Sequence, residues 1–361
     1  MAVSIKALEH RKQQLLDILL WCMLLALTAL SAGNIAAMRQ YSAVSLRYET
    51  PFSGQAAYKA RQYCVEQGGE DAFWPTFWRE DEVQISAEHS KVTARCILFS
   101  GNASLVWPAE YLSGGAPGVI DDAGCSVSSG LAWALWGDAG AHAGTAGKSI
   151  EIDGETRTVR GVFEEEEPLV LLSLKDEDQT QRFTAVELAG GPSVPSRSEV
   201  EDFAAASGLG KADTVLMGTP SLIAELLAAA PLLLLACYGL ALCLGRLKKR
   251  PAALRGMVVF LACVGAAALL PVFLNLLPDW VIPSKWSDFS FWSALFGQTG
   301  KNLREYLTPV PCARDAGYSL LFFKQAGIAV LLLGSSLTIC VRLHGKTRHK
   351  TNHRNRRINH G

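Results

Sequence analysis

The chain has 361 residues, of which 49% are hydrophobic, and its mean hydropathy is +0.18. This apolar content is high for a soluble domain and indicates that part of the chain lies in a membrane. The formal net charge is zero, but acids predominate between Arg39 and Thr214, whereas bases predominate at both ends and near residue 250. A chain with this balance is not a general nucleic-acid binder, and its basic segments are those of a membrane protein.

The first apolar run covers residues 15–37 and is long enough to cross the ~30 Å hydrocarbon layer as a helix. Lys6, Arg11 and Lys12 precede it, so the positive-inside rule predicts a cytosolic N-terminus. Residues 1–14 are interpreted as an amphipathic segment on the inner face. The alternative is a signal peptide cleaved near Ser31, but the run is long for one and further apolar runs follow.

Residues 38–215 are soluble in character and predict a mixed α+β domain. The expected elements are helices over 53–67 and 199–206 and strands over 83–85, 92–99, 169–174 and 183–188. Gly68-Gly69 is expected to end the first helix, and Ser198 is expected to cap the second. The aromatic cluster at residues 73–78 is interpreted as a core anchor, with a ligand cage as the alternative.

The densest pattern lies between residues 125 and 163. Leu131, Ala132 and Leu135 recur at helical spacing, and Gly137 is expected to end this helix. The segments 149–152 and 156–162 alternate apolar and polar residues on either side of Asp153-Gly154, which predicts a β-hairpin. The expected order is therefore helix, glycine turn and hairpin.

This order of residues resembles the extracytoplasmic core domain of MacB/FtsX-like ABC permeases. The residues that carry the resemblance are Ser128, Leu131, Ala132, Leu135, Gly137, Gly147, Lys148, Ile150, Gly154, Val159, Gly161 and Val162. The resemblance implies a permease subunit that does not hydrolyse ATP itself. It also implies a separate cytosolic ABC ATPase as partner, and commonly a second permease subunit.

Three further apolar runs, residues 216–244, 254–277 and 318–341, are predicted to span the membrane. Pro231 is expected to bend the second span. The basic link 245–253 and the basic tail 342–361 are placed in the cytosol. We expect the tail to be disordered and to bind lipid rather than nucleic acid. The aromatic segment 278–317 is interpreted as an outer loop with an interfacial helix, with a substrate-binding aromatic wall as the alternative.

The sequence thus predicts a membrane protein with four transmembrane α-helices and an α+β extracytoplasmic domain inserted between the first and second spans. Both termini lie in the cytosol, and the protein is expected in the cell membrane as a multi-pass protein. The same topology is similar to that of MacB/FtsX-like permeases.

One departure from that family concerns the cytosolic link, which in the family carries a coupling helix that docks on the ATPase. Residues 245–253 are too few for such a helix. The candidate ATPase-facing residues are Arg246, Lys248, Lys249, Arg250 and Arg255. The alternative is an ATPase-uncoupled membrane protein whose outer domain is a binding or assembly module.

A membrane-bound enzyme is the third class, and the sequence offers no catalytic, metal or cofactor constellation for it. A near match to a phosphate-binding loop fails because His142 replaces its first glycine. The acidic run at residues 164–167 is interpreted as a solvated turn rather than a cation site. Cys64 and Cys96 are a candidate disulfide, since the outer compartment permits one, but the four outer cysteines allow three pairings.

Overall fold

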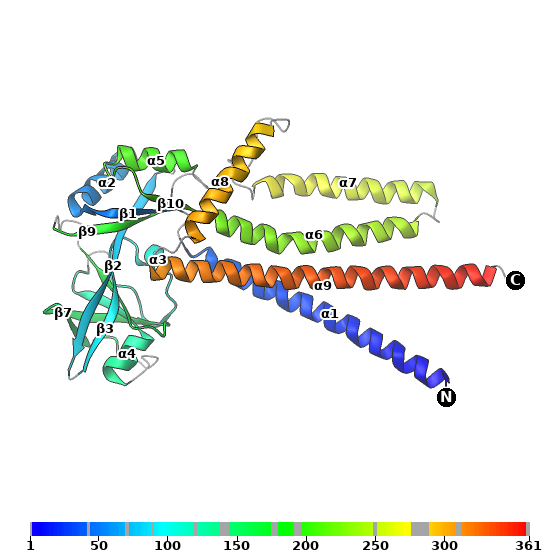
Figure 1. The fold of residues 1–361 in the computed structure, drawn as a ribbon, viewed down its shortest axis with the longest axis horizontal. Helices are drawn as coiled ribbons and strands as arrows, with labels where there is room; N and C mark the ends of the chain where they lie inside the picture. The colour runs from blue at the N-terminus through cyan, green and yellow to red at the C-terminus, as the bar shows by residue number, and fades with distance from the viewer. Residues whose placement is uncertain are drawn as a thin grey trace. The chain divides into compact units, whose positions relative to one another are not determined.

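The computed structural model describes residues 2–41, 44–68, 72–88, 90–118, 121–137, 144–174, 180–190, 196–247, 251–275, 289–307 and 312–358. It describes the backbone alone at residues 2–10, 246–247, 255, 266, 269–275, 306–307 and 346–358. The chain divides into two compact units (Figure 1). The helical unit comprises Met1–Met38, Pro220–Leu277 and Leu320–Gly361, and the domain comprises Arg39–Thr219 and Pro278–Ser319.

The domain is built on a ten-stranded mixed sheet. Its order is β10-β1-β9-β2-β3-β8-β5-β7-β4, and β6 pairs with both β2 and β7. The strands are β1 Val44–Ser53, β2 Phe73–Ala87, β3 Ser90–Ser100, β4 Tyr111–Gly114, β5 Gly124–Ser128, β6 Ser149–Ile152, β7 Glu155–Phe163, β8 Leu169–Ser173, β9 Arg182–Gly190 and β10 Thr214–Met217. Only the pairs β3–β8 and β5–β7 are parallel among the described strands.

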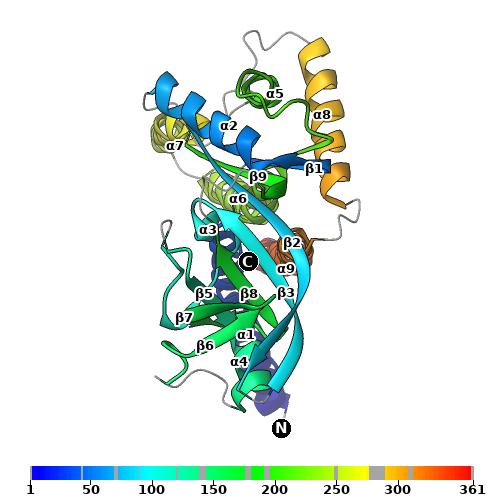
Figure 2. The same ribbon diagram turned by 90° about the vertical axis from the view of Figure 1, so that its left-hand side faces the viewer.

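Strand β2 connects the two halves of this sheet (Figure 2). Its first part pairs with β9, and its second part runs along β3 to the far end. Side chains of β2 belong to three hydrophobic clusters. Phe77 is buried in the cluster with α2 and α5, Ile85 in the cluster with α4, and Trp78 in the third cluster. The aromatic cluster is therefore part of a strand, and its core-anchor interpretation holds for Phe77 and Trp78 but not for the exposed Trp74.

The helices of the domain are α2 Gly54–Gln67, α3 Ala103–Val106, α4 Ser129–Trp136, α5 Arg197–Ala206 and α8 Phe289–Leu307, with the start of α9. Helix α2 confirms the prediction, with Ser53 as its N-cap and Gly68 at its C-terminal end. The predicted N-cap of α5 was wrong. Ser196, not Ser198, accepts a hydrogen bond from the Glu199 amide, and the Glu199 carboxylate accepts one from the Ser196 amide, because only that spacing closes a capping box.

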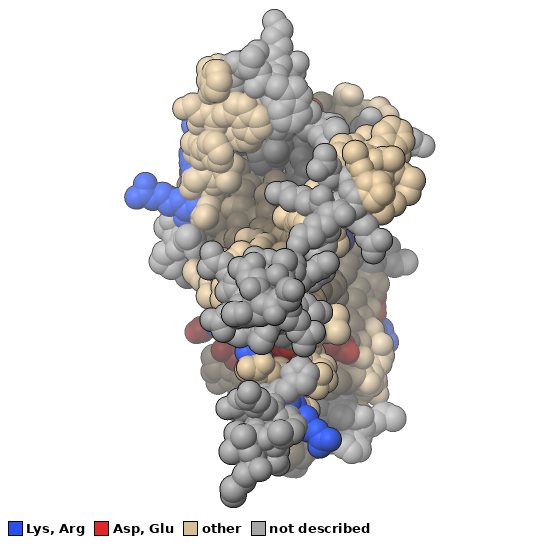
Figure 3. Space-filling view, turned by 90° about the vertical axis from the view of Figure 1, so that its right-hand side faces the viewer, with Lys and Arg blue, Asp and Glu red and all other residues tan. Residues whose placement is uncertain are grey.

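The helical unit contains α1 Ala2–Met38, α7 Ala252–Asn275 and most of α6 Thr219–Leu247 and α9 Ala313–Ile358. Three helical stretches of the described chain are long and apolar enough to cross a membrane: Arg11–Met38, Thr219–Gly245 and Ala313–Gly345. The described apolar stretch of α7 is shorter, Ala252–Gly265. In the view of Figure 3, most of the described surface is neither acidic nor basic.

Helices α1 and α9 pack as an antiparallel pair. Asn34 donates to the Gln325 side chain at 3.2 Å, and Gln325 donates to Ser31 at 2.6 Å. Toward the other end of the pair, Arg342 donates to Asp17 at 2.7 Å. On both helices the two contacts are about 17 residues, or ~25 Å of helix rise, apart. Polar contacts thus bracket a length close to that of the ~30 Å hydrocarbon layer, with apolar packing between them.

Several predicted boundaries change in the structure. Residues 216 and 217, predicted as the start of a span, belong to β10, because they continue its pairing with β1. The predicted outer loop, residues 278–317, belongs to the domain and includes α8. The tail, which was predicted to be disordered, continues α9 as helix to Ile358, because extending a helix that is already formed adds one hydrogen bond per residue without a new nucleation step.

Candidate functional site

A buried cluster of charges fixes the first turn of α9 to the domain sheet. The Nε and Nη2 atoms of Arg47 in β1 donate to the two carboxylate oxygens of Asp315 in α9, at 3.0 and 2.8 Å. Both side chains are less than a tenth exposed. A bidentate contact of this kind fixes both the distance and the orientation of the two groups.

Glu187 in β9 is the second carboxylate of the cluster, and its side chain is fully buried. It lies 3.0 Å from the Nη1 atom of Arg47 and 2.9 Å from the Nη2 atom of Arg314. It also accepts hydrogen bonds from the Trp78 indole at 3.0 Å and from the Ser45 hydroxyl. A carboxylate so deeply buried needs such partners, because an unpaired buried charge costs several kcal/mol.

The cluster contains two guanidinium groups and two carboxylates, so its charges balance. Burial by itself lowers the pKa of Arg47, but the neighbouring Asp315 and Glu187 outweigh it and raise that pKa above its ordinary value. Arg47 also lies over the Trp78 ring, and Arg314 lies over the Tyr41 ring, at 4.9 and 5.3 Å from the ring centres. Arg47 therefore stays charged.

Other contacts hold the same helix turn. The Ala313 amide donates to the Glu80 carboxylate in β2 at 2.9 Å, which satisfies one of the free amides at a helix N-terminus. The Nε atom of Arg314 donates to the Leu105 carbonyl oxygen in α3 at 3.2 Å. The head of α9 is thus tied to β1, β2, β9 and α3, and the geometry allows it little independent movement.

A second polar contact set holds α8 against α5 and the first residue of α6. Asn302 donates to the Thr219 hydroxyl at 3.1 Å. Arg197 donates to Asn302 at 3.2 Å, to Glu305 at 3.0 Å and to Glu201 at 2.9 Å. These contacts position α8, which the sequence placed in an outer loop, as part of the domain.

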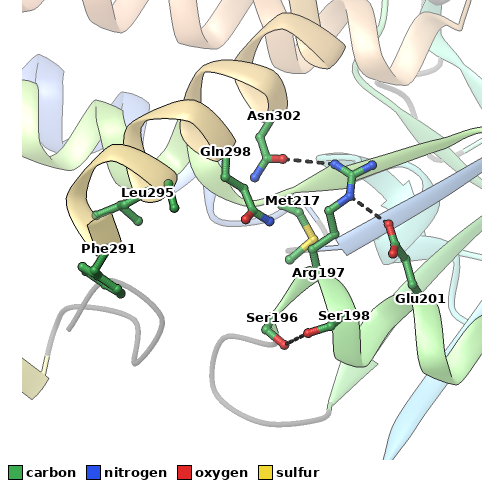
Figure 4. A pocket seen from close by; sticks show the side chains of 10 residues that line it. Ser196, Arg197, Ser198, Glu201, Met217, Phe291, Leu295, Gln298 and Asn302 are labelled. Carbon is green, nitrogen blue, oxygen red and sulfur yellow. Dashed lines mark hydrogen bonds and ion pairs between the residues drawn. The ribbon is translucent and has the colours of Figure 1, made fainter. Parts of the chain in front are cut away.

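A pocket of about 380 Å³ lies between α5, β10 and α8 (Figure 4). It is lined by Ser196, Arg197, Ser198, Glu201, Met217, Phe291, Ala294, Leu295, Gln298 and Asn302. The Arg197 guanidinium in its wall is paired with two carboxylates, Glu201 and Glu305. The pocket therefore combines these paired charges with the apolar side chains of Met217, Phe291, Ala294 and Leu295.

The residues that resemble the family motif build one part of the core. Ser128 is the N-cap of α4, and its hydroxyl also donates to the Glu167 carbonyl oxygen. Gly137 ends α4 in the left-handed conformation, and Asp153-Gly154 forms the hairpin turn with positive φ at both residues. These elements confirm the predicted helix, glycine turn and hairpin. The apolar motif residues meet in one buried cluster: Leu131, Ala132, Leu135, Ile150, Val159 and Val162.

The remaining motif residues support the same cluster. The Gly147 amide donates to the Val159 carbonyl oxygen, and the Lys148 ammonium lies 4.8 Å from the centre of the Trp136 ring. Gly161 lies against Gly115, where a Cβ atom would come within 2.4 Å of the Gly115 carbonyl oxygen. In the structure these residues form a scaffold rather than a reactive site.

The other predicted site residues lie apart from the charge cluster. Cys64 and Cys96 are free thiols buried in two different hydrophobic clusters, so the candidate disulfide is not formed in the structure. The acidic run at residues 164–167 includes Glu165, whose carbonyl oxygen accepts the Gly130 amide. Among the described residues no group of three or more His, Cys, Asp or Glu is placed to hold a metal ion. The candidate ATPase-facing side chains, Arg246, Lys248, Lys249, Arg250 and Arg255, lie outside the described residues.

Sequence reasoning missed the charge cluster because its charged members come from three separate segments, β1, β9 and the start of α9. The available signals were a lone acid, Glu187, in a strand that is otherwise mostly apolar, and the pair Arg314-Asp315 directly before an apolar run. Neither signal indicates which distant residue pairs with the charged side chain.

The fold and the site define a membrane protein whose α+β domain holds the first turn of a candidate span in a buried charge cluster. No protein-family profile matches the chain, and no curated protein matches it. Its structure is similar to the extracellular domain of the noncanonical ABC-type transporter YknZ from Gram-positive bacteria, at 12% identity and a TM-score of 0.34, over 45% of this chain and 88% of that one. It is also similar to the periplasmic region of MacB from Actinobacillus actinomycetemcomitans, at 10% identity and a TM-score of 0.39, over 48% of this chain and 87% of that one.

Proposed function

We propose that the protein is the permease-type membrane subunit of an ABC transporter of the MacB/FtsX-like class. In this proposal four spans carry the domain on the extracytoplasmic side, and both termini lie in the cytosol. A separate ATPase drives the spans, and the domain uses the motion to export a lipid, peptide or lipoprotein or to activate an outer partner.

The observation that carries the proposal is the buried cluster at the head of α9. A helix that transmits motion needs a firm attachment at its outer end, because a loose one would absorb the displacement. Arg47, Glu187, Arg314 and Asp315 supply that attachment with paired charges. Rearranging such a cluster exposes or unpairs buried charges, which favours discrete states over gradual deformation.

Two other helices join the same part of the sheet through the chain itself. Helix α1 ends at Met38 and β1 begins at Val44, while β10 ends at Met217 and α6 begins at Thr219. Strands β1 and β10 are neighbours in the sheet, and β1 also carries Arg47. Motion of α1, α6 or α9 therefore reaches adjacent strands, which supports a transmitting role.

The cytosolic side of the proposal concerns the link between α6 and α7. Helix α6 ends at Leu247 and α7 begins at Ala252, so the link has no room for a separate coupling helix. We propose that its basic residues face the ATPase: Arg246, Lys248, Lys249, Arg250 and Arg255. The same short link favours the alternative, an ATPase-uncoupled membrane protein whose outer domain binds or assembles a partner.

Capture of the tagged full-length protein from its own membranes distinguishes the permease proposal from the ATPase-uncoupled alternative. We expect a stoichiometric ABC ATPase in the eluate, together with a second permease subunit. Replacing the five link residues with glutamine should abolish ATPase recovery, whereas replacing five basic residues of the tail should not: Arg348, Lys350, Arg354, Arg356 and Arg357.

Both variants must first be shown to keep the domain outside, since basic residues also set the topology. Recovery of an extracytoplasmic partner without any ATPase would overturn the transporter proposal in favour of the alternative. Accessibility of the tail rather than the domain in intact cells would overturn the orientation.

A further inference from the structure

Helix α8 has one face committed to the domain. Phe291, Leu295, Gln298 and Asn302 point toward the pocket beside α5 (Figure 4), and Asn302 binds Arg197 and Thr219. The spacing of these residues, four, three and four, is that of a single helix face. This face is therefore occupied, and any further partner of α8 must bind its other side.

The opposite face of α8 carries Phe289 and Phe296, which are 84% and 72% exposed. They are the two most exposed large apolar side chains among the described residues of the whole chain. They are seven positions apart, so they lie on the same side of the helix, and Phe296 is rotated by roughly 140° from Phe291. Two phenylalanines of this exposure on one helix face mark a candidate contact surface, since larger exposed apolar patches are typical of interaction or membrane sites.

The chain itself restricts what that partner is. Helix α8 ends at Leu307 and α9 begins at Ala313, and so short a connection spans at most ~21 Å. Exposed apolar side chains suited to lipid, Leu320 and Phe323, begin roughly 10 Å further along α9. The other end of α8 is connected to α7, another apolar helix. Both ends of α8 are thus connected to apolar helices, and one of these, α9, is long and apolar enough to cross a membrane.

We propose that the Phe289–Phe296 face of α8 lies in the headgroup region of the membrane that α9 enters. Aromatic side chains favour that region, and an amphipathic helix lies in it with its apolar face toward the acyl chains. This use of α8 requires no ATPase and is therefore independent of the proposed function. Since the inner face of α8 binds Arg197 and Thr219, the lipid contact would also fix α5 and the first residue of α6.

Photocrosslinking of the full-length protein in nanodiscs of phosphatidylethanolamine and phosphatidylglycerol tests this inference. The photoreactive residue p-benzoylphenylalanine replaces Phe289 or Phe296, and adducts are identified by mass spectrometry. Val330, exposed on α9, is the positive control, and Trp133, exposed on α4 in the domain, is the matched negative control.

We expect lipid adducts at Phe289, Phe296 and Val330 and none above background at Trp133. Polypeptide adducts at Phe289 and Phe296, whether to a second copy or to another protein, would overturn the inference, as would adducts no more frequent than at Trp133. The replacement retains an aromatic ring at an exposed site, so the melting temperature should not change, and that measurement confirms that the tested protein is folded.

Discussion

Arg47 and Asp315 bind each other through two hydrogen bonds of 3.0 and 2.8 Å although 268 positions of sequence separate them. One residue belongs to β1 and the other to the first turn of α9. The contact fixes the register between the start of the domain and the start of the last long helix. Its burial makes it sensitive to the loss of either partner.

Replacing Arg47 with methionine should therefore destabilise the domain strongly. Arg47→Met leaves the Asp315 carboxylate buried without its bidentate partner, which costs about 3–5 kcal/mol. For a domain of this size that corresponds to a melting temperature lower by roughly 6–20 °C.

Arg95→Met is the matched control, because Arg95 also pairs with two carboxylates, Glu80 and Glu167, but is 37% exposed. The control should cost less than about 1 kcal/mol. Equal losses in both variants would contradict the importance of burial.

Removing both partners should recover much of this loss. The double variant Arg47→Met, Asp315→Leu deletes one positive and one negative charge together and leaves the pair of Arg314 and Glu187 in place. Apolar replacement of a complete buried ion pair is often neutral or stabilising. We expect a melting temperature above that of Arg47→Met alone. A double variant that is less stable than either single variant would show that the charges act through other partners.

The motif residue Gly161 gives a test of the scaffold role. In Gly161→Ala the new Cβ atom would lie 2.4 Å from the Gly115 carbonyl oxygen, which is backbone and cannot rotate away. We expect a loss of about 3 kcal/mol or more in the free energy of unfolding, or failure to fold. Gly118→Ala is the control, since its nearest neighbouring atom would be 3.9 Å away. A Gly161→Ala variant with unchanged unfolding would contradict the close approach of β7 to Gly115, the residue after β4.

The sequence predicted local structure better than the contacts between distant segments. The hairpin at Asp153-Gly154 and the end of α4 at Gly137 follow from residues next to each other, so periodicity and turn chemistry were sufficient. Strand β5 was not predicted, because its run between Gly124 and Ser128 is too short and too buried to show alternation.

The charge cluster depends on tertiary pairing that no local pattern encodes. Glu187 is a single acid in β9, and its partners come from β1, β2 and α9. The attachment of α8 to α5 was missed for the same reason. Its aromatic residues predicted an interfacial helix, whereas Asn302 and Glu305, which attach it to α5, carried no signal in sequence.

Alkaline pH should weaken the domain through its buried thiols. Burial raises the pKa of the Cys125 thiol from 9.0 to about 12, so the folded state holds the neutral form where the unfolded chain ionises. The stabilising effect is complete below pH 9 and is lost as the pH rises from 9 toward 12, at up to about 1.4 kcal/mol per pH unit. Cys125→Ala should show a smaller fall in melting temperature between pH 8 and 11. Cys263→Ala, in the helical unit, should keep the original slope, and identical slopes in all three proteins would contradict the assignment to Cys125.

The antiparallel pairing of α1 and α9 predicts a specific crosslink. Gln325 donates to Ser31 at 2.6 Å, so cysteines at both positions should form a disulfide on mild oxidation of the full-length protein in membranes. Leu30 is the matched control, because it precedes Ser31 on the same helix but is exposed, and Leu30→Cys with Gln325→Cys should remain unlinked. Peptide mass spectrometry distinguishes the new bond from any formed by native cysteines.

At the far end of the α1–α9 pair, exchanging Asp17 and Arg342 should preserve the ion pair, whereas Asp17→Arg alone places two cations together and should lower the crosslinking yield. Equal crosslinking from Ser31→Cys and Leu30→Cys would mean that α1 rotates freely against α9, and the two polar contacts would then not define one fixed register.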